Sequence, residues 1–511
     1  MKRSPGWAEF FGWQVERDNG TPLFRQLYLQ IRAAILSLTL APGTRLPSTR
    51  DLASRLRLAR ASVVSAYEQL LAEGYLVGKV GSGTYISSDL PERLVRRPVA
   101  RAPATIRRHP RVPTPATRLE RLAQSTGESD HRPFAMGRCR VDVRTVETWR
   151  RLTQQTLRGL GPAHLGYSDA RGLPELCQTL CEYLRAARAV RCEPEQIVVT
   201  AGTQQAVDLA IRLLFEPGDE AWVEDPGYPM TRAALLAAGV RPRAVPVDSH
   251  GLDVRAGRRT APKARAAFVT PSNHYPLGVV LSMPRRLELL AWARESAAWI
   301  VEDDFDSEFR YSGRPLASLQ GLDDGERVIY TGTFNKVLFP GLRIGFAVVP
   351  FPLLRAFVTA RYLVDRHPPS LSQAVAATFM RQGHFTTHLR RMRQLYREQR
   401  DALALELEHR AGAELMLDVP DHGMHLVAYL RHGRADIAVE RAAHTHGVVA
   451  RAISSLYMAA PPQSGLLLGF TGFAPETIAP AVARLVASFG DIARRREIRL
   501  GSPARRSSEQ G

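Results

Sequence analysis

The apolar residues near the start of the chain recur at helical spacing. Leucine and isoleucine follow one another every three or four positions through residues 21–40, which predicts an amphipathic helix. Proline and glycine interrupt this pattern in the stretch 41–48. Ser48 and Asp51 then form a pattern that resembles a capping box, which predicts a second, short helix that ends at Leu56.

A third helix and two strands follow directly. Apolar positions predict a helix over residues 60–73, and Gly74 is the residue type that commonly ends a helix in the left-handed conformation. Two short strands, 75–79 and 84–87, flank a turn at 81–83. The side chains that we expect to face the core from the third helix are Val63, Tyr67, Leu70 and Leu71. This order of elements predicts an α+β domain of the winged helix-turn-helix type.

After this first domain, helices alternate with short apolar strands over residues 134–490. The strands are expected at residues 196–200, 220–225, 266–270, 298–303 and 327–332. Such alternation predicts an α/β domain with a mainly parallel central sheet. Because ligands of these sheets bind beyond the carboxyl ends of the strands, the residues that follow each strand are the first candidates for a site.

Three strand ends have residues suited to a ligand. Gly202, Thr203 and Gln204 follow the first strand and open a helix, where backbone N–H groups can hold a phosphate, although a simple helix cap would use the same residues. Tyr228 follows the second strand, where its ring would either face a planar ligand or pack within a loop. The acids in the stretch 302–306 are costly at one strand end unless a cation balances them.

Lysine is rare in this chain, which draws attention to the lysine after the fifth strand. Of 69 basic residues only four are lysines, namely Lys2, Lys79, Lys263 and Lys336. A lysine amine can lose its proton and form an imine, whereas an arginine cannot. A surface lysine without a function is the alternative, and the residues that flank Lys336 disfavour it.

The net charge of +19 is concentrated toward the N-terminus. Residues 1–88, the predicted DNA-binding domain, hold 11 basic and 6 acidic side chains, whereas 134–489 hold 42 and 36. The segment 89–133 has ten arginines and seven prolines, which predicts a linker that does not order itself. It is either a basic tether that attracts phosphate or a solubilising spacer. A short basic tail is expected at 491–511.

The composition limits the possible classes of protein. A chain of 511 residues exceeds one ordinary core, and 45% hydrophobic residues excludes wholesale disorder. The absence of a run of 18 apolar residues argues against a transmembrane helix, and the N-terminal residues do not resemble a secretory signal. The four cysteines lack the spacing of metal ligands, so we expect no metal site and a cytoplasmic protein.

The N-terminal domain resembles the GntR superfamily of winged-helix regulators. The resemblance extends through PLFRQLYLQIRAAIL, LAPGTRLPSTRDLA, SVVSAYEQLLAEGYL and GSGTYIS. It implies that Arg50 contacts phosphate or base edges of DNA, and that Arg60 begins a recognition helix that also contains Ser62. The residues that it places at the tip of the wing, near a DNA groove, are Gly81, Ser82 and Gly83.

One stretch departs from the pattern of that superfamily. Where relatives commonly have Ser-Arg-Asn-Thr-Val, this chain has Ala-Arg-Ala-Ser-Val at residues 59–63. The change removes a hydroxyl that would cap the helix and a polar side chain that would read a base. We therefore expect DNA binding with a sequence preference different from that of the relatives.

The large domain resembles the fold-type I aminotransferases that use pyridoxal 5'-phosphate (PLP). The motifs are GYSDARG, VVTAGTQQA, VEDPGYP, VEDDFDSEFRY, and YTGTFNK followed by LFPGLRIGF. The resemblance implies that Lys336 forms the Schiff base with PLP and that Asp303 pairs with the pyridine nitrogen. It also implies that Tyr228 stacks on the ring, and that the phosphate is held by Gly202, Thr203, Gln204, Thr333 and Arg343.

The two domains together resemble the MocR subfamily of GntR-type regulators. That layout implies a PLP-dependent regulator of transcription that binds promoter DNA, with the large domain as a sensor of PLP and of a small amino compound. Domain closure around that compound would alter DNA binding. It also implies a head-to-tail homodimer. Two alternatives are an active aminotransferase with an accessory DNA-binding domain and a DNA-binding protein whose large domain has lost PLP.

Several residues of the large domain depart from the aminotransferase pattern. Phe305 stands where relatives often have a tyrosine that contacts PLP, and Asn335 replaces the usual serine before the lysine. Leu467 occupies the place of the arginine that holds a substrate carboxylate in aminotransferases. Arg451 or Arg232 would have to replace that arginine from elsewhere. These changes weaken the prediction of an enzyme more than that of PLP binding, and a residual half-reaction is all that we expect.

Overall fold

The computed structural model describes residues 15–16, 20–79, 81–90, 113–123, 131–161, 165–313, 316–323 and 327–500, the last ten by their backbone alone. The chain divides into two compact units, Met1–Arg111 and Val112–Gly511. The division falls inside the predicted linker, of which residues 91–112 and 124–130 lie outside the described residues. The predicted tail is described only up to Leu500, where the last helix ends.

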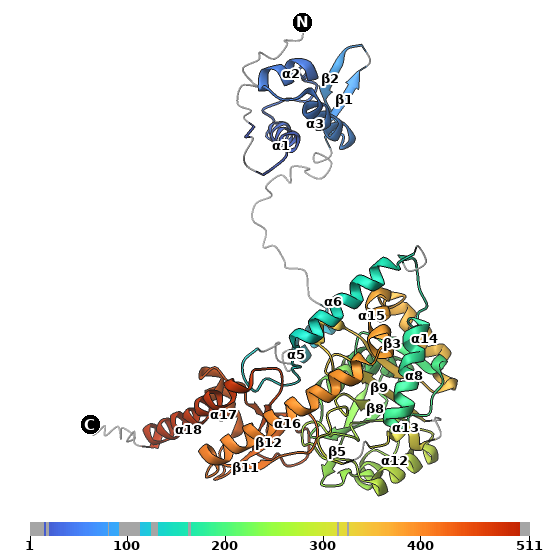
Figure 1. The fold of residues 1–511 in the computed structure, drawn as a ribbon, viewed down its shortest axis with the longest axis vertical. Coiled ribbons are helices and arrows are strands. Elements are labelled where there is room, and N and C mark those ends of the chain that lie inside the picture. Colours follow the sequence, from blue (N-terminus) through green and yellow to red (C-terminus); the bar gives the residue numbers. More distant parts are fainter. Residues whose placement is uncertain are drawn as a thin grey trace, which may run out of the picture. The chain divides into compact units, whose positions relative to one another are not determined.

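The first unit is a winged helix-turn-helix domain, as predicted (Figure 1). Its elements are α1 (Leu23–Leu36), α2 (Thr49–Leu56), α3 (Arg60–Ala72), β1 (Leu76–Lys79) and β2 (Gly83–Ile86). Ser48 caps α2, because its hydroxyl accepts the Asp51 N–H at 3.2 Å. Gly74 follows α3 with a φ of +78°, the left-handed conformation that ends the helix. The two strands then pair antiparallel, with Leu76 opposite Ile86.

The core of this unit forms between the three helices and the hairpin. Leu27 and Ile31 of α1 are fully buried, and Val63, Tyr67 and Leu70 of α3 meet them. The prediction that Leu71 also faces the core is wrong, since 38% of this residue is exposed. The reason is geometric: with 3.6 residues per turn, Leu71 lies at the edge of the stripe that these three residues define.

A helix lies within the segment that the sequence predicted to be a linker without order. This helix, α5 (Thr114–Ala123), packs against α10 (Pro229–Ala237) of the large domain, and for these residues the prediction of a disordered linker is wrong. Ala116 and Leu122 are half-buried, although Leu119 is exposed. Tertiary packing against a partner orders a short helix whose composition alone would not do so.

The second unit is built on an eight-stranded, mainly parallel sheet, which confirms the predicted fold class. In spatial order the strands are β3 (Ile197–Thr200), β10 (Gly345–Val348), β9 (Val328–Thr333), β8 (Trp299–Asp304), β7 (Ala266–Val269), β4 (Glu220–Asp225), β5 (Arg241–Asp248) and β6 (Gly251–Leu252). Only β10 and the edge strand β6 run antiparallel to their neighbours.

Helices cover both faces of this sheet (Figure 1). The helices of this unit up to the second sheet are α6 (Val143–Arg158), α8 (Pro174–Arg188), α9 (Thr203–Leu214), α10, α11 (Val254–Thr260), α12 (Met283–Glu295), α13 (Leu319–Leu322), α14 (Phe351–Asp365), α15 (Ser370–Arg381) and α16 (His384–Ala411). In β3, Val198 packs into one apolar cluster while Ile197 and Val199 pack into another. Burial on both faces explains why these strands are continuous apolar runs.

A second, antiparallel sheet follows α16, which the sequence analysis did not predict. Its strands, in spatial order, are β11 (Leu415–Asp418), β12 (His425–Leu430), β14 (Gly465–Gly469) and β13 (Arg451–Ala452). Two helices accompany it, α17 (Asp436–Thr445) and α18 (Ile478–Leu500), and α18 extends ten residues into the predicted tail. Short 3-10 helices occur at Pro194–Gln196, Pro340–Leu342, Ser454–Leu456 and Pro475–Thr477.

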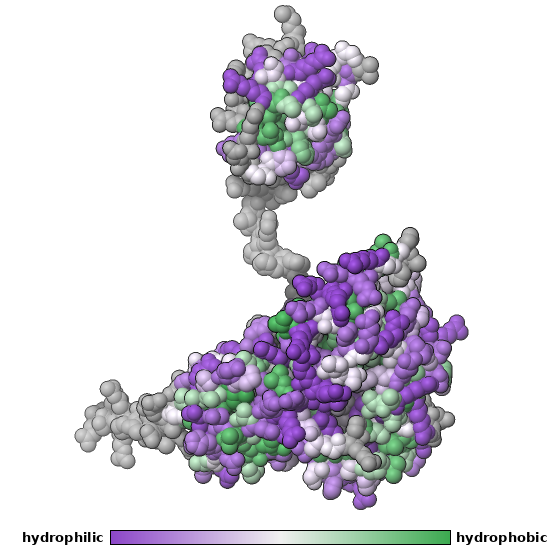
Figure 2. All heavy atoms as spheres, in the orientation of Figure 1, coloured by the Kyte–Doolittle hydropathy of each residue, from purple (hydrophilic) through white to green (hydrophobic). Residues whose placement is uncertain are grey.

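The outer surface of this unit is mainly polar on the face shown in Figure 2, with small groups of apolar residues between. None of the helices in the described part of the chain is both long and apolar enough to cross a membrane.

Candidate functional site

The residues predicted for the cofactor come together at one edge of the large sheet. Gly345, at the start of β10, pairs with Thr200 and with Thr333, the last residues of β3 and β9. Gly202 and Lys336 follow these two strand ends by two and three residues. The sheet topology therefore brings together segments that are more than 100 residues apart in the sequence.

Gly202 leaves a small space that several polar side chains surround. Its φ of +140° is a conformation that only glycine adopts readily. A Cβ atom at this position would lie 2.6 Å from Asn335 Nδ2, and 3.8 Å from both Arg343 Nη2 and Thr333 Oγ1. The absence of a side chain at Gly202 thus keeps open a space beside an amide, a hydroxyl and a guanidinium, next to the N-terminus of α9.

Not all of the polar groups around this space have a hydrogen-bond partner among the described residues. The Thr203 hydroxyl is buried and, among the described residues, has no hydrogen-bond partner. Asn335 Nδ2 donates to the carbonyl of Ala201 at 3.3 Å, whereas its Oδ1 is without a partner. This polar space beside Gly202, the cradle, has free donors at the N-terminus of a 12-residue helix, which suits a phosphate dianion. Gln204 is half-buried in the same first turn.

Asp303 is the acid of the stretch 302–306 that the protein leaves uncompensated. Its Oδ1 is buried and lacks a hydrogen-bond partner in the region that the structure describes. Burial, followed by the charge of Asp304, raises the pKa of this carboxyl to about 7, although Lys336 and the Thr203 hydroxyl oppose the shift. A buried carboxylate with a free oxygen fits a cationic group such as a protonated pyridine nitrogen.

The neighbouring acids have partners within the protein. Asp304 forms a buried ion pair with Arg188 at 2.8 Å. Glu302 accepts the backbone N–H groups of Leu319 and Gln320 at 2.8 and 2.9 Å. Asp306 accepts both hydrogen bonds of the Asn273 amide, at 2.7 and 2.9 Å. The sequence predicted that a cation must balance these acids, and the structure shows how each is stabilised.

The amine of Lys336 faces the segment that enters the large domain before α6. Nζ donates to the carbonyl of Gly137 at 3.1 Å, and a Cβ at Gly137, whose φ is +64°, would overlap this amine. The Cys139 thiol donates to the backbone carbonyl of Lys336 at 3.0 Å. The sequence analysis did not identify Gly137. Glycine suits this position because its φ is positive and because a side chain there would displace the Lys336 amine.

Two tyrosines form an aromatic wall beside Asp303. The rings of Tyr228 and Tyr275 meet edge to face with 5.4 Å between their centroids. Burial, followed by the charge of Asp303, raises the pKa of Tyr228 to about 12. Tyr228 is still 42% exposed, so one part of its ring is available to a ligand. Sequence reasoning did not assign Tyr275 a role.

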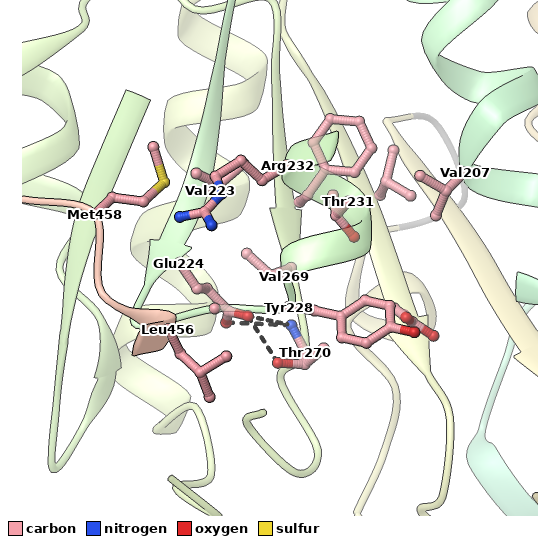
Figure 3. Close-up of a pocket in the computed structure, with 14 residues that line it drawn as sticks. Val207, Val223, Glu224, Tyr228, Thr231, Arg232, Val269, Thr270, Leu456 and Met458 are labelled. Carbon is pink, nitrogen blue, oxygen red and sulfur yellow. Dashed lines mark hydrogen bonds between the residues drawn. The ribbon is translucent and has the colours of Figure 1, made fainter. Parts of the chain in front are cut away.

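A pocket opens between Tyr228 and the strands β4, β7 and β8 (Figure 3). Its lining includes Asp303, Arg232 and Glu224. Glu224 accepts the hydroxyl of Thr270 at 2.7 Å, and burial raises the pKa of Glu224 to about 8. The pocket thus extends from the aromatic wall to a buried acid that the sequence analysis did not single out.

The two residues that depart from the aminotransferase pattern, Phe305 and Leu467, belong to one apolar cluster. Leu467 is fully buried there, and Phe305 is partly buried. Neither side chain can form a hydrogen bond with a ligand, as the sequence analysis expected for both positions.

In the winged-helix unit, the residues predicted to bind DNA are exposed, with one exception. Arg50 and Arg60 are exposed on α2 and α3, and Arg60 Nε lies 3.5 Å from Thr49 Oγ1. Ser62 is half-buried in the first turn of α3. The turn residues of the wing are all exposed, namely Gly81, Ser82 and Gly83.

The structure adds two cations to the wing that sequence reasoning missed. Arg45 forms a β-bridge with Tyr85, and a Cβ at Gly83 would lie 3.0 Å from Arg45 Nε. Lys79 lies over the Tyr85 ring, 5.1 Å from its centroid. The available signal was Lys79, the one cation of the predicted hairpin, whereas Arg45 lies far from the wing in the sequence.

Comparisons with known proteins agree with this arrangement of two units. Residues 23–86 match the family of bacterial regulatory proteins named gntR, and residues 133–485 match aminotransferase class I and II. The probable rhizopine catabolism regulatory protein MocR of Rhizobium meliloti is 39% identical over 93% of this chain and 95% of its own length. The pyridoxine biosynthesis transcriptional regulator PdxR of Corynebacterium glutamicum is 32% identical over 91% and 95%.

A solved structure extends the comparison to the cofactor. The α-aminoadipate aminotransferase LysN of Thermus thermophilus, in complex with N-(5'-phosphopyridoxyl)-L-leucine, matches with a TM-score of 0.67 and 27% identity. The match covers 75% of this chain and 98% of LysN. The aminotransferase class implies PLP as the cofactor, and the open cradle and the free carboxylate fit its phosphate and its pyridine nitrogen. The chain belongs to the MocR-type transcriptional regulators, which join a gntR-type DNA-binding domain to an aminotransferase-like PLP domain.

Proposed function

We propose that PLP attached at Lys336, together with a small amino compound, sets the affinity of this regulator for promoter DNA. The observation that supports the proposal most is the position of the Lys336 amine at the same sheet edge as the phosphate cradle and the unpaired Asp303 carboxylate. When bound, PLP supplies an aldehyde group, at which a primary amine can replace the lysine. The large domain would then report on an amine in the cytoplasm.

Each residue of the site has a proposed part in holding the cofactor. Asp303 would face the pyridine nitrogen and keep it protonated, because its carboxylate has no other cationic partner at its free oxygen. Tyr228 would cover one face of the ring. The phosphate would lie in the cradle formed by Gly202, Thr203, Gln204, Thr333 and Arg343.

The segment that precedes α6 connects this site to the linker from the DNA-binding unit. The carbonyl of Gly137 accepts a hydrogen bond from the Lys336 amine. The carbonyl of Phe134 accepts the Gly469 N–H of β14 at 2.9 Å. When the Lys336 amine forms an imine, it no longer donates the same hydrogen bond to the carbonyl of Gly137. Occupation of the lysine therefore alters a contact to the segment through which the linker enters the domain.

DNA contacts are proposed for the exposed basic face of the winged helix. Arg50, Arg60, Ser62 and the wing tip Gly81–Gly83 would lie against phosphates and base edges.

Exposed apolar residues on the large domain support the further proposal of a head-to-tail homodimer, since they would be covered by a second copy. They include Val143, Leu165, Tyr167 and Leu363, which are 71 to 80% exposed.

A residual transamination half-reaction is a second candidate activity. Lys336 retains an amine that could move a proton at the bound amino carbon, and Asp303 is in place. Without an arginine at Leu467, an amino acid would not be oriented as in the aminotransferases, so we propose that any turnover is slow.

The proposal is tested by the absorbance of purified protein with PLP. A band near the visible edge that borohydride fixes to the chain is expected for the natural protein and for Lys263→Ala, a matched exposed-lysine control. Lys336→Ala should lose the fixed band. A footprint on the protein's own upstream DNA, with and without PLP, tests regulation. A fixed band that persists in Lys336→Ala, or a footprint that never responds to PLP or to amines, would contradict the proposal.

A further inference from the structure

A cluster of apolar side chains stands where an acidic substrate group would be held in a typical aminotransferase. Leu467 of β14 is fully buried in this cluster. Its other buried members are Tyr275, Val427, Ile453 and Leu456, with Met136, Phe305 and Tyr429 packed at the edge. A carboxylate would lose its hydration at this position without gaining a charged partner, so an anion must be bound by another residue or not at all.

Arg451 is the cation that the fold places next to this cluster. It is the direct partner of Leu467 in the antiparallel pair β13–β14. Residues directly opposite in such a pair extend from the same face of the sheet, about 5 Å apart at Cβ. The side chain of Arg451 therefore starts on the face that contains Leu467, one strand farther out.

Arg451 is half-buried, and in the described residues neither a hydrogen bond nor an ion pair engages its guanidinium. Its charge opposes the rise in the pKa that burial causes in both Tyr228 and Tyr275. The same charge opposes the rise in the pKa of the half-buried Glu440, although no ion pair joins the two side chains among the residues described. A half-buried cation without a bonded acid, close to both tyrosines of the aromatic wall, is available to bind an anion.

Arg232 is the other arginine that the sequence offers in place of the missing one, and its position is less suitable. It lines the pocket beneath the aromatic wall together with Val223 and Met458. In Figure 3 its guanidinium lies on the side of Met458 and Glu224, away from the ring of Tyr228. It thus points away from Tyr228, which forms the aromatic wall together with Tyr275.

We propose that Arg451 binds the acidic group of the effector, so that the regulator senses primary amines that carry an anionic group such as a carboxylate. This inference rests on the proposed function, since it assumes that an amine exchanges with Lys336. The carbon skeleton of the effector would pack against the cluster around Leu467, while its amine reaches the cofactor. Arg451 is therefore a residue that determines specificity and takes no part in the attachment of PLP.

The test is a titration of the PLP-loaded protein with pairs of amines of equal length, followed by the absorbance of the bound cofactor. One suitable pair is 5-aminopentanoate and pentylamine, and another is L-leucine and 3-methylbutylamine. We expect at least one acidic member to bind the natural protein more tightly than its uncharged counterpart. Loss of a charge-assisted pair in Arg451→Gln should weaken the acidic member roughly 10- to 100-fold and leave the uncharged one unchanged.

Two further variants separate this role from a structural one. Arg451→Lys keeps the charge without the forked donor and should recover part of the lost affinity. Arg232→Gln is the matched control and should keep the preference for the acidic member. The inference is overturned if uncharged amines bind as tightly as acidic ones, or if Arg451→Gln keeps the preference. In both cases a borohydride-fixed band at Lys336, together with a footprint that responds to PLP or to amines, would show that the proposed function itself still stands.

Discussion

At the scale of single residues, the acids at the end of β8 show what a sequence can and cannot determine. The stretch 302–306 predicts that charge must be compensated there, because so many acids end one strand. Alternation along the strand then sends Glu302 and Asp304 to one face and Asp303 to the other. The partners of Asp304 and Glu302, which are Arg188 and the start of α13, are distant in sequence. Only the fold therefore shows that, within this stretch and among the residues described, Asp303 is the acid with an unpaired oxygen.

Asp303→Asn should have opposite effects on cofactor binding and on stability. Loss of the carboxylate removes the partner of the pyridine nitrogen, so PLP should bind about 10- to 100-fold more weakly. In the cofactor-free protein, however, the folded state keeps a proton on Asp303 up to a pKa of about 7, whereas the unfolded state releases it near pH 4. The natural protein therefore loses stability as pH rises through this window, and the variant lacks that loss.

The measurement is urea denaturation of both cofactor-free proteins at pH 5.5 and pH 8. Other buried acids with raised pKa values are present in both proteins, and for one of them, Glu302, the rise comes from burial and from Asp304, so its contribution cancels in the comparison. The difference in unfolding free energy, in favour of Asp303→Asn, should grow by on the order of 1 to 2 kcal/mol between the two pH values. A difference that does not change with pH would show that Asp303 titrates normally in the folded protein.

At the scale of elements, α2 and α3 begin in different ways. Ser48 caps α2 through the Asp51 N–H, whereas the residue that precedes α3 is Ala59, whose side chain cannot accept a hydrogen bond. The backbone of Ala59 already has an extended conformation, with φ of −63° and ψ of 135°, which is suited to a capping residue. The start of α3 is therefore less stable than its geometry allows.

Ala59→Ser should stabilise the first turn of α3 by about 0.5 to 2 kcal/mol, because its hydroxyl can accept the N–H of Ala61 or Ser62. Hydrogen exchange of the peptides that cover α3, measured in the full chain, should slow accordingly. Ser48→Ala is the converse variant and should speed exchange in α2. If exchange in α3 is the same in Ala59→Ser, then the N-terminal groups of this helix already have other partners.

The elements that the sequence predicted are those with a local signal. Apolar runs located five strands of the large sheet, β3, β4, β7, β8 and β9, but not the parallel strand β5. Helical spacing with a capping box located the helices of the winged domain. What it missed depends on distant partners. The helix α5 is ordered by α10, and the antiparallel direction of β10 follows from its place between β3 and β9. The cross-strand pairing of Arg451 with Leu467 is equally a product of the sheet.

At the scale of the whole molecule, the distribution of charge makes a prediction about DNA binding that neither unit makes alone. The segment 89–133 has ten arginines against five acids, whereas the large domain is nearly balanced. The question is whether these arginines contact DNA or only keep the chain soluble. Counterion release distinguishes the two, because each phosphate that a cation neutralises steepens the fall of affinity with salt.

Replacement of three linker arginines by glutamine should flatten this salt dependence if the segment acts as a tether. The chosen residues are Arg101, Arg107 and Arg108. The slope of log affinity against log salt concentration should fall by about 0.9 for each phosphate that is no longer neutralised, on specific and on random DNA alike. The control is a variant with the same net charge, in which glutamine replaces Arg212, Arg255 and Arg258, exposed arginines of the large domain that pair with acids. If both variants bind with one slope, net charge alone sets the affinity and the segment is only a spacer. If the linker variant alone has the shallower slope, the linker is part of the DNA-binding surface.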